Sequence, residues 1–239
     1  FTFALALSLF SNYYIGLFTC IFCVFMFTAS GIIEFRGIKN LLRKIFIMIR
    51  SSILAIALAA FILLPSYYGL KITYSANNTF PEETIQNYKW NEIFANLVSY
   101  KNPTALDGLP NFSSGMLAVM LFGVFMLSFG VKIREMGAYS LMLGLMVVSC
   151  NINKLDLIWH GLHVPNQIPH RYSFIFSFVL IVMAYRAYDV LLKNGIKAYQ
   201  LLLMLAGPVI VFWCERLYYV KDENDPKKEY LRFRSVGFD

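Results

Sequence analysis

The residues best suited to chemistry lie close together, between positions 159 and 172. This stretch holds all three histidines of the chain, His160, His163 and His170, and Arg171 follows the last of them directly. Strongly apolar sequence flanks it on both sides. A membrane tolerates clustered ionisable side chains only where protein or water shields them, so the cluster is a predicted functional site.

The histidines could serve as metal ligands or as hydrogen-bonding groups. If the chain were helical here, His160 and His163 would share a face and could hold a zinc ion. Pro165 and Pro169 disfavour a continuous helix, no cysteine stands at a suitable spacing, and Asp156 is the one nearby acid. We therefore expect the imidazoles to contact a polar ligand or to hydrogen-bond at the interface, and a divalent metal remains an open alternative.

Arg171 is the strongest single candidate for ligand binding. It precedes an apolar run over residues 174–190, so its guanidinium lies beside the free N–H groups of a helix start. That combination suits a phosphate or pyrophosphate group. The alternative is an arginine that only extends to the lipid headgroups.

Three further positions are candidates on the same predicted side of the membrane. Asn12 and Tyr13 interrupt two apolar runs, and their polar groups could line the cavity that the histidine stretch faces. Asp107, in a turn-rich segment over residues 102–111, is a weak candidate for a general base. A turn aspartate that bonds its own backbone is the competing interpretation.

Composition indicates a membrane protein. Hydrophobic residues make up 58% of the 239, charged residues 15%, and mean hydropathy is +0.58. Soluble domains have about 25% charged residues. The net charge of +7 belongs to basic residues beside apolar segments, where they set topology and meet anionic lipid, so we expect no binding of nucleic acid. Cys20 and Cys23 lie within an apolar run, where the C-x-x-C spacing reads as small buried hydrophobes.

The predicted fold class is all-α, a polytopic bundle of six to seven membrane segments over residues 1–214. The outer loops cover residues 65–115 and 151–171, and a polar tail covers residues 215–239. The chain opens at Phe1 within an apolar run, which predicts a fragment truncated at the N-terminus. The expected segments are Phe1 to Phe10 (partial), Ile15 to Ile33, Ile45 to Leu64, Met116 to Val131, Ala138 to Cys150, Phe174 to Val190 and Leu201 to Cys214.

The basic residues predict the orientation of these segments. Ten lysines and arginines alternate onto one side, which the positive-inside rule makes cytoplasmic. The tail after Cys214 holds six more but falls on the opposite side by parity, so its placement stays open. The ten are Arg36, Lys39, Arg43, Lys44, Arg50, Lys132, Arg134, Arg186, Lys193 and Lys197.

Several phrases, taken together, resemble the YfhO family of bacterial membrane proteins over roughly residues 5–200. They are Ser11-Asn12-Tyr13-Tyr14-Ile15-Gly16, Leu63-Leu64-Pro65 with Tyr67-Tyr68, Gly108-Leu109-Pro110-Asn111 with Ser114-Gly115, Trp159-His160-Gly161, Pro169-His170-Arg171-Tyr172-Ser173-Phe174 and Ala184-Tyr185-Arg186-Ala187.

The resemblance implies a GT-C-type glycosyltransferase fold in the bacterial cytoplasmic membrane, with the active site on the outer face. Its partners would be an undecaprenyl-phosphate-linked sugar donor and a cell-surface polymer such as lipoteichoic acid. The acidic residue of such enzymes usually lies in the first outer loop, upstream of this chain, which leaves the catalytic base unassigned. A non-catalytic scaffold, and after it a transporter, are the rival interpretations. The substrate-binding set expected here is Arg171, His160, His163, His170, Asn166, Asn12, Tyr13 and Asn111.

Overall fold

A computed structural model describes residues 1–72, 80–98, 104, 108–162 and 168–222 of the chain. Secondary structure within these ranges is helical apart from one isolated β-bridge, between Gln86 and Ile152. The helices are α1 (Thr2–Ser11), α2 (Tyr13–Ile33), α3 (Ile38–Ile72), the 3-10 turn η2 (Ala95–Leu97), α4 (Met116–Leu127), α5 (Ile133–Asn151), α6 (Asn153–Trp159), α7 (Ser173–Asn194) and α8 (Ala198–Asp222).

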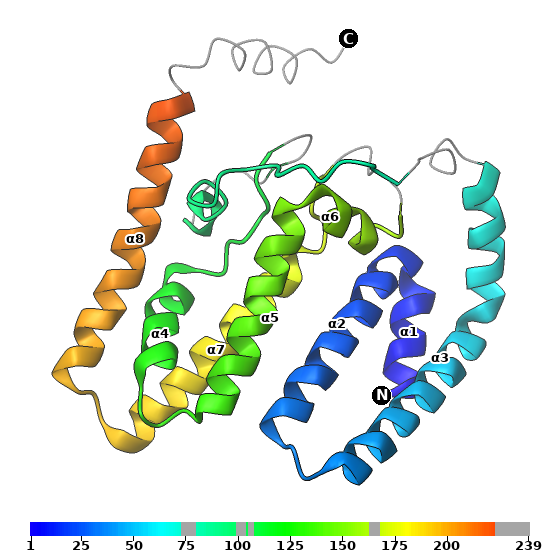
Figure 1. The fold of residues 1–239 in the computed structure, drawn as a ribbon, viewed down its shortest axis with the longest axis horizontal. Coiled ribbons are helices and arrows are strands. Elements are labelled where there is room, and N and C mark those ends of the chain that lie inside the picture. Colours follow the sequence, from blue (N-terminus) through cyan, green and yellow to red (C-terminus); the bar gives the residue numbers. More distant parts are fainter. Residues whose placement is uncertain (73–79, 99–103, 105–107, 163–167, 223–239) are drawn as a thin grey trace.

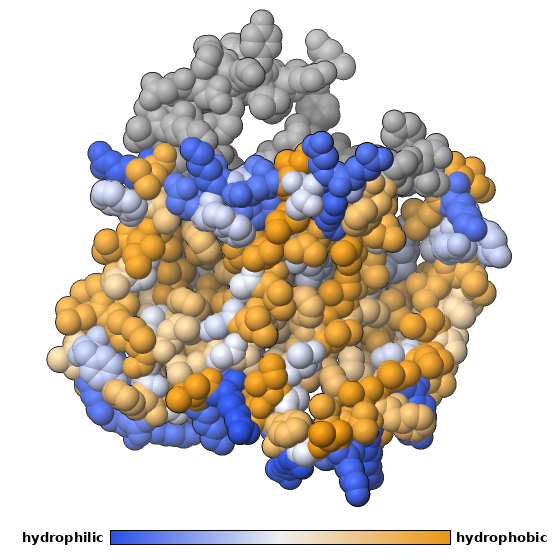
Figure 2. All heavy atoms as spheres, viewed as in Figure 1, coloured by the Kyte–Doolittle hydropathy of each residue, from blue (hydrophilic) through white to orange (hydrophobic). Residues whose placement is uncertain are grey.

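The predicted all-α membrane bundle is confirmed. Five helices are long and apolar enough to cross a bilayer, namely α2, α3, α5, α7 and the first twenty residues of α8. Figure 2 shows hydrophobic side chains over the middle of the visible face and hydrophilic ones toward its two ends. Apolar side chains that face outward in this way suit a hydrocarbon solvent.

Several helices extend beyond the predicted spans, α5 from Ile133 and α8 over Ala198–Asp222 among them, and two differences have a local explanation. We expected a span to end before Pro65, yet α3 continues through it to Ile72. Proline removes one donor from a helix without forcing it to stop, and the neighbouring Ser66 hydroxyl donates to the Ile62 carbonyl at 2.8 Å. In the other direction, α4 ends at Leu127 because the backbone turns extended at Ser128.

The helices form two groups that meet along α2 (Figure 1). Helices α1, α2 and α3 pack on one another, with a small core that includes Leu5, Leu9 and Ala55. Helices α4, α5, α7 and α8 surround the main core, in which Phe125 and Met183 are completely buried. Contacts of α2 with α5 and α6 join the groups.

Helices α4 and α8 approach each other very closely. A Cβ added at Gly207 would lie 2.8 Å from the Val119 carbonyl oxygen, and one at Gly123 would lie 3.0 Å from that of Leu203. Small residues at a helix crossing allow this backbone contact, which is a common way to join helices in membranes. The short α4 is therefore held by α8 as well as by α7.

The turns and loops separate onto the two ends of the bundle. The basic turns α2–α3, α4–α5 and α7–α8 lie at one end, whereas α6, η2 and the α1–α2 turn lie at the other (Figure 1). We call these the basic end and the loop end. At the loop end, residues 108–115 run down between the helices to α4, and Phe112 stacks on Phe176 with ring centroids 4.0 Å apart.

Candidate functional site

The short helix α6 carries the centre of the candidate site. It begins two residues after α5 ends, and its Asp156 and His160 are four residues apart, so both side chains lie on one face. The segment over residues 85–88 is fixed to this junction, since the Asn151 side chain accepts from the Tyr88 N–H at 2.8 Å. The Asn151 carbonyl accepts from the Asn87 N–H at the same distance.

Asp156 is the hub of a polar network at the loop end. Its Oδ1 accepts hydrogen bonds from His170 Nδ1 at 2.8 Å and from the Tyr172 hydroxyl at 2.9 Å. His160 Nε2 lies 3.7 Å from the same oxygen. The Asp156 side chain keeps 16% of its surface exposed. One carboxylate oxygen is thus held by two hydrogen-bond donors.

His170 connects Asp156 to the segment over residues 85–88. Its Nε2 lies 2.9 Å from the Tyr88 hydroxyl, which donates to the Gly108 carbonyl at 2.7 Å. The His170 ring thus bridges the Asp156 carboxylate and the Tyr88 hydroxyl through its two nitrogens.

His160 connects Asp156 to α2, in the other group of helices. Its Nδ1 hydrogen-bonds the Tyr14 hydroxyl, and its fully buried ring packs edge-on against Phe18 and Tyr172. The Arg171 guanidinium lies over the Tyr14 ring, 5.3 Å from the centroid. A cation over an aromatic face is held in place without losing its charge.

Tyr172 closes the site from within the bundle. Its ring is completely buried and stacks on Trp159, with centroids 4.4 Å apart and planes 8° from parallel. Burial, followed by the nearby Cys150 and Asp156, raises the pKa of the Tyr172 hydroxyl well above its usual range. Tyr172 therefore acts as a neutral donor to Asp156.

Comparison with known proteins identifies the family. The model of the family described as bacterial membrane protein YfhO matches residues 1–226. The chain belongs to the YfhO family. The match confirms the resemblance seen in the sequence and extends it beyond residue 200. No curated protein and no solved structure matches the chain.

In this YfhO chain, three of the expected ligand-binding residues converge. His160, His170 and Arg171 all lie at the Asp156 network, His160 and His170 in direct contact with it and Arg171 through the Tyr14 ring. Tyr13, next to Tyr14, is partly exposed at the start of α2. His163, Asn166 and Asp107 lie outside the described residues.

The side chains of two expected binding residues form hydrogen bonds with the backbone. Asn12 caps α2, because its Oδ1 accepts from the N–H groups of Tyr14 and Ile15, both at 3.0 Å. The Asn111 amide pairs with both backbone groups of Thr104, at 2.9 and 3.2 Å. These bonds position the YfhO loops at the loop end, and any contact with substrate stays a prediction.

Sequence reasoning missed Asp156, Tyr88 and Tyr172 as site residues. The spacing of Asp156 and His160 on one helical turn was the available signal for the first. The sequence offered no comparable signal for Tyr88, which reaches His170 across 82 positions. Among the described residues no group of three His, Cys, Asp or Glu side chains could hold a metal ion.

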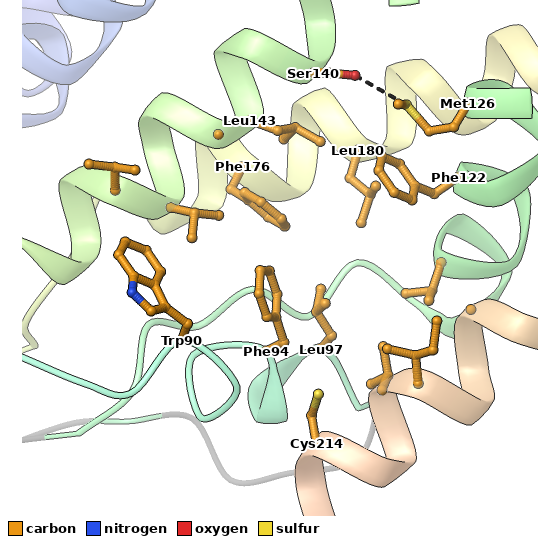
Figure 3. A pocket seen from close by; sticks show the side chains of 17 residues that line it. Trp90, Phe94, Leu97, Phe122, Met126, Ser140, Leu143, Phe176, Leu180 and Cys214 are labelled. Carbon is orange, nitrogen blue, oxygen red and sulfur yellow. Dashed lines mark hydrogen bonds between the residues drawn. The ribbon is translucent and has the colours of Figure 1, made fainter.

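An apolar cavity of about 550 Å³ lies within the larger group of helices. Hydrocarbon side chains of α4, α5, α7, α8 and η2 line it, including Phe94, Phe122 and Phe176 (Figure 3). Its one hydroxyl, on Ser140, is already bonded to the Met126 sulfur at 3.1 Å. Phe176 comes one helical turn after Tyr172, so the cavity begins directly below the polar network.

Proposed function

We propose that this YfhO chain is a membrane glycosyltransferase that works at the outer face of the bacterial cytoplasmic membrane. It would move a sugar from an undecaprenyl-phosphate-linked donor to a cell-surface polymer such as lipoteichoic acid. One observation carries the proposal, namely the Asp156 carboxylate, which His170 and Tyr172 hold through Oδ1, in a network whose Tyr14 ring carries the Arg171 guanidinium. Membership of the YfhO family supports a site in the membrane, and the proposed chemistry is argued from these residues.

Asp156 would act as the general base. Its Oδ2 accepts the proton of an acceptor hydroxyl while that hydroxyl oxygen forms a bond to the anomeric carbon of the sugar. The bond from that carbon to the phosphate oxygen breaks, and the lipid phosphate leaves with the electron pair. His170 and Tyr172 hold the carboxylate in one orientation, which lowers the entropy cost of the step.

Arg171 would stabilise the phosphate of the donor. A guanidinium binds phosphate through two parallel N–H bonds, and negative charge grows on the leaving oxygen as the glycosidic bond breaks. The Tyr14 ring beneath Arg171 fixes the direction of the guanidinium. The position of Arg171 before α7 and its contact with Tyr14 both support this role.

The apolar cavity supports a lipid-linked donor over a soluble one. Its walls are almost entirely hydrocarbon, its one hydroxyl is bonded to the Met126 sulfur, and it lies within a bundle whose outer surface is hydrocarbon. A sugar nucleotide would find few polar groups to bind there. A prenyl or acyl chain would replace lipid contacts with equivalent protein contacts.

The decisive experiment replaces Asp156 in the full-length protein. Asp156→Asn keeps an oxygen for His170 and Tyr172 but removes the base, so we expect sugar incorporation into the surface polymer to fall by roughly 10²-fold or more. Incorporation is measured by sugar analysis of purified polymer from cells whose own gene is deleted, at matched protein levels. Glu83→Gln, an exposed acid at the same end, is the control and should leave incorporation unchanged.

Arg171→Gln separates the phosphate role from the base. Loss of incorporation with both Arg171→Gln and Asp156→Asn supports the complete proposal. Full incorporation by Asp156→Asn at normal protein level would refute the base. If neither variant has an effect while deletion of the gene does, the protein is a scaffold and not the transferase.

A further inference from the structure

A second cavity, of about 520 Å³, lies at the basic end of the bundle. It opens between the α2–α3 hairpin and the start of α5, on the opposite end from the Asp156 network. Apolar side chains form its walls, among them Phe27, Ile32, Phe35 and Leu41. Arg134 is the one charged residue in the lining.

The Arg134 guanidinium has no acidic partner within the described part of the chain. Two acids at the same end of the bundle are already engaged. Glu135 binds Arg186 through two hydrogen bonds, at 2.6 and 3.2 Å, and Glu34 at the end of α2 binds Lys44 at 3.1 Å. Arg134 therefore brings an unneutralised positive charge to the rim of a hydrocarbon-walled cavity.

We propose that this cavity binds an anionic phospholipid, with an acyl chain between α2 and α3 and the phosphate on Arg134. The apolar walls of the cavity suit the acyl chain of such a lipid, and Arg134 suits its phosphate. Basic pockets between membrane helices select anionic headgroups, and the surrounding Arg36 and Lys39 strengthen the selection by their field. The start of α5 adds unpaired N–H groups close to Arg134.

A free phosphate ion does not account for the shape of the site. The cavity walls are apolar, so a phosphate ion would contact only the exposed Arg134 and would leave the apolar part of the cavity unfilled. A phospholipid fills the walls and meets the charge at once. The competing interpretation, an arginine that only extends to bulk headgroups, predicts no preference between lipids at this position.

The test compares lipids of one chain composition on the purified full-length protein in neutral detergent. Phosphatidylglycerol, which carries a net negative charge, should raise the melting temperature more than zwitterionic phosphatidylcholine. We expect a difference of roughly 2–4 °C, the size that one charge contact gives in a chain of this length. Arg134→Gln should abolish this difference.

Matched variants guard against a general loss of stability. Lys132→Gln removes a neighbouring charge outside the cavity and should retain the preference, while Arg134→Lys should restore part of it. Gly31→Leu fills the cavity, where a Cβ meets only Leu41 at 3.6 Å, and should weaken stabilisation by both lipids. Equal stabilisation by the two lipids, an unchanged preference in Arg134→Gln, or the same shift with inorganic phosphate would each overturn the proposal.

Discussion

At the scale of residues, one carboxylate organises side chains from four separate parts of the chain. Asp156 accepts hydrogen bonds from His170 and Tyr172; His170 also bonds Tyr88, and His160 beside Asp156 bonds Tyr14. A largely buried carboxylate is stable only when it accepts hydrogen bonds, so each donor supports both the fold and the site. Removing one of the donors to Asp156 should therefore lower the free energy of unfolding even where the arrangement of the site is kept.

Tyr172→Phe tests this dependence. It keeps the stack on Trp159 but removes the donor to Asp156, so we expect the free energy of unfolding to fall by about 1.5–3 kcal/mol, measured by thermal denaturation in detergent. The pKa of Tyr172 is raised, so its neutral form contributes fully below the unfolded value of about 10 and loses that contribution as pH rises toward the folded pKa. The difference in the free energy of unfolding between the native protein and Tyr172→Phe should thus narrow only above about pH 10. Tyr185→Phe, at an exposed position on the same helix, should change stability little, and an equal loss there would refute the assignment.

At the scale of elements, the close contact of α4 and α8 positions the walls of the apolar cavity. Val119 and Gly207 both line that cavity and also form the contact. Gly207→Leu should push the helices apart and lower stability by about 1–3 kcal/mol, as overpacking does elsewhere. Thermal unfolding measures the change, with Gly137→Leu as the control because a Cβ there meets nothing within 4 Å. Equal melting temperatures for the two variants would contradict the tight contact.

The sequence predicts helix positions well and helix ends less well. Runs of apolar residues located α2, α5 and α7, because a bilayer demands a continuous hydrocarbon surface. The extension of α3 past Pro65 depends on local hydrogen bonding that hydropathy does not register. Helix α6 is too short and too mixed in polarity to stand out, yet it carries the hub of the site.

The sequence predicts the part of the site that lies within one short stretch, but not the residues that packing brings to it. Residues that lie close in sequence, such as His160, His170 and Arg171, can be recognised from their chemical type. Tyr14 and Tyr88 are common membrane-interface residues, and only the packed structure shows that they meet the histidines.

At the scale of the whole molecule, the separation into a basic end and a loop end makes a topological prediction. The positive-inside rule assigns the basic end to the cytoplasm. With the four native cysteines replaced, Glu82→Cys should react with a membrane-impermeant thiol reagent in intact cells. Lys132→Cys and Lys197→Cys should react only after permeabilisation. Labelling of Lys132→Cys in intact cells would reverse the orientation and move the proposed chemistry inside.

The bond between Tyr14 and His160 also has a consequence for biogenesis. The two residues are separated by 146 positions and belong to different helix groups. At typical translation speeds of 5–20 residues per second, Tyr14 is made roughly 7–30 s before His160. The first hairpin is therefore complete before α6 exists, and the network around Asp156 can close only after the start of α7 has been made.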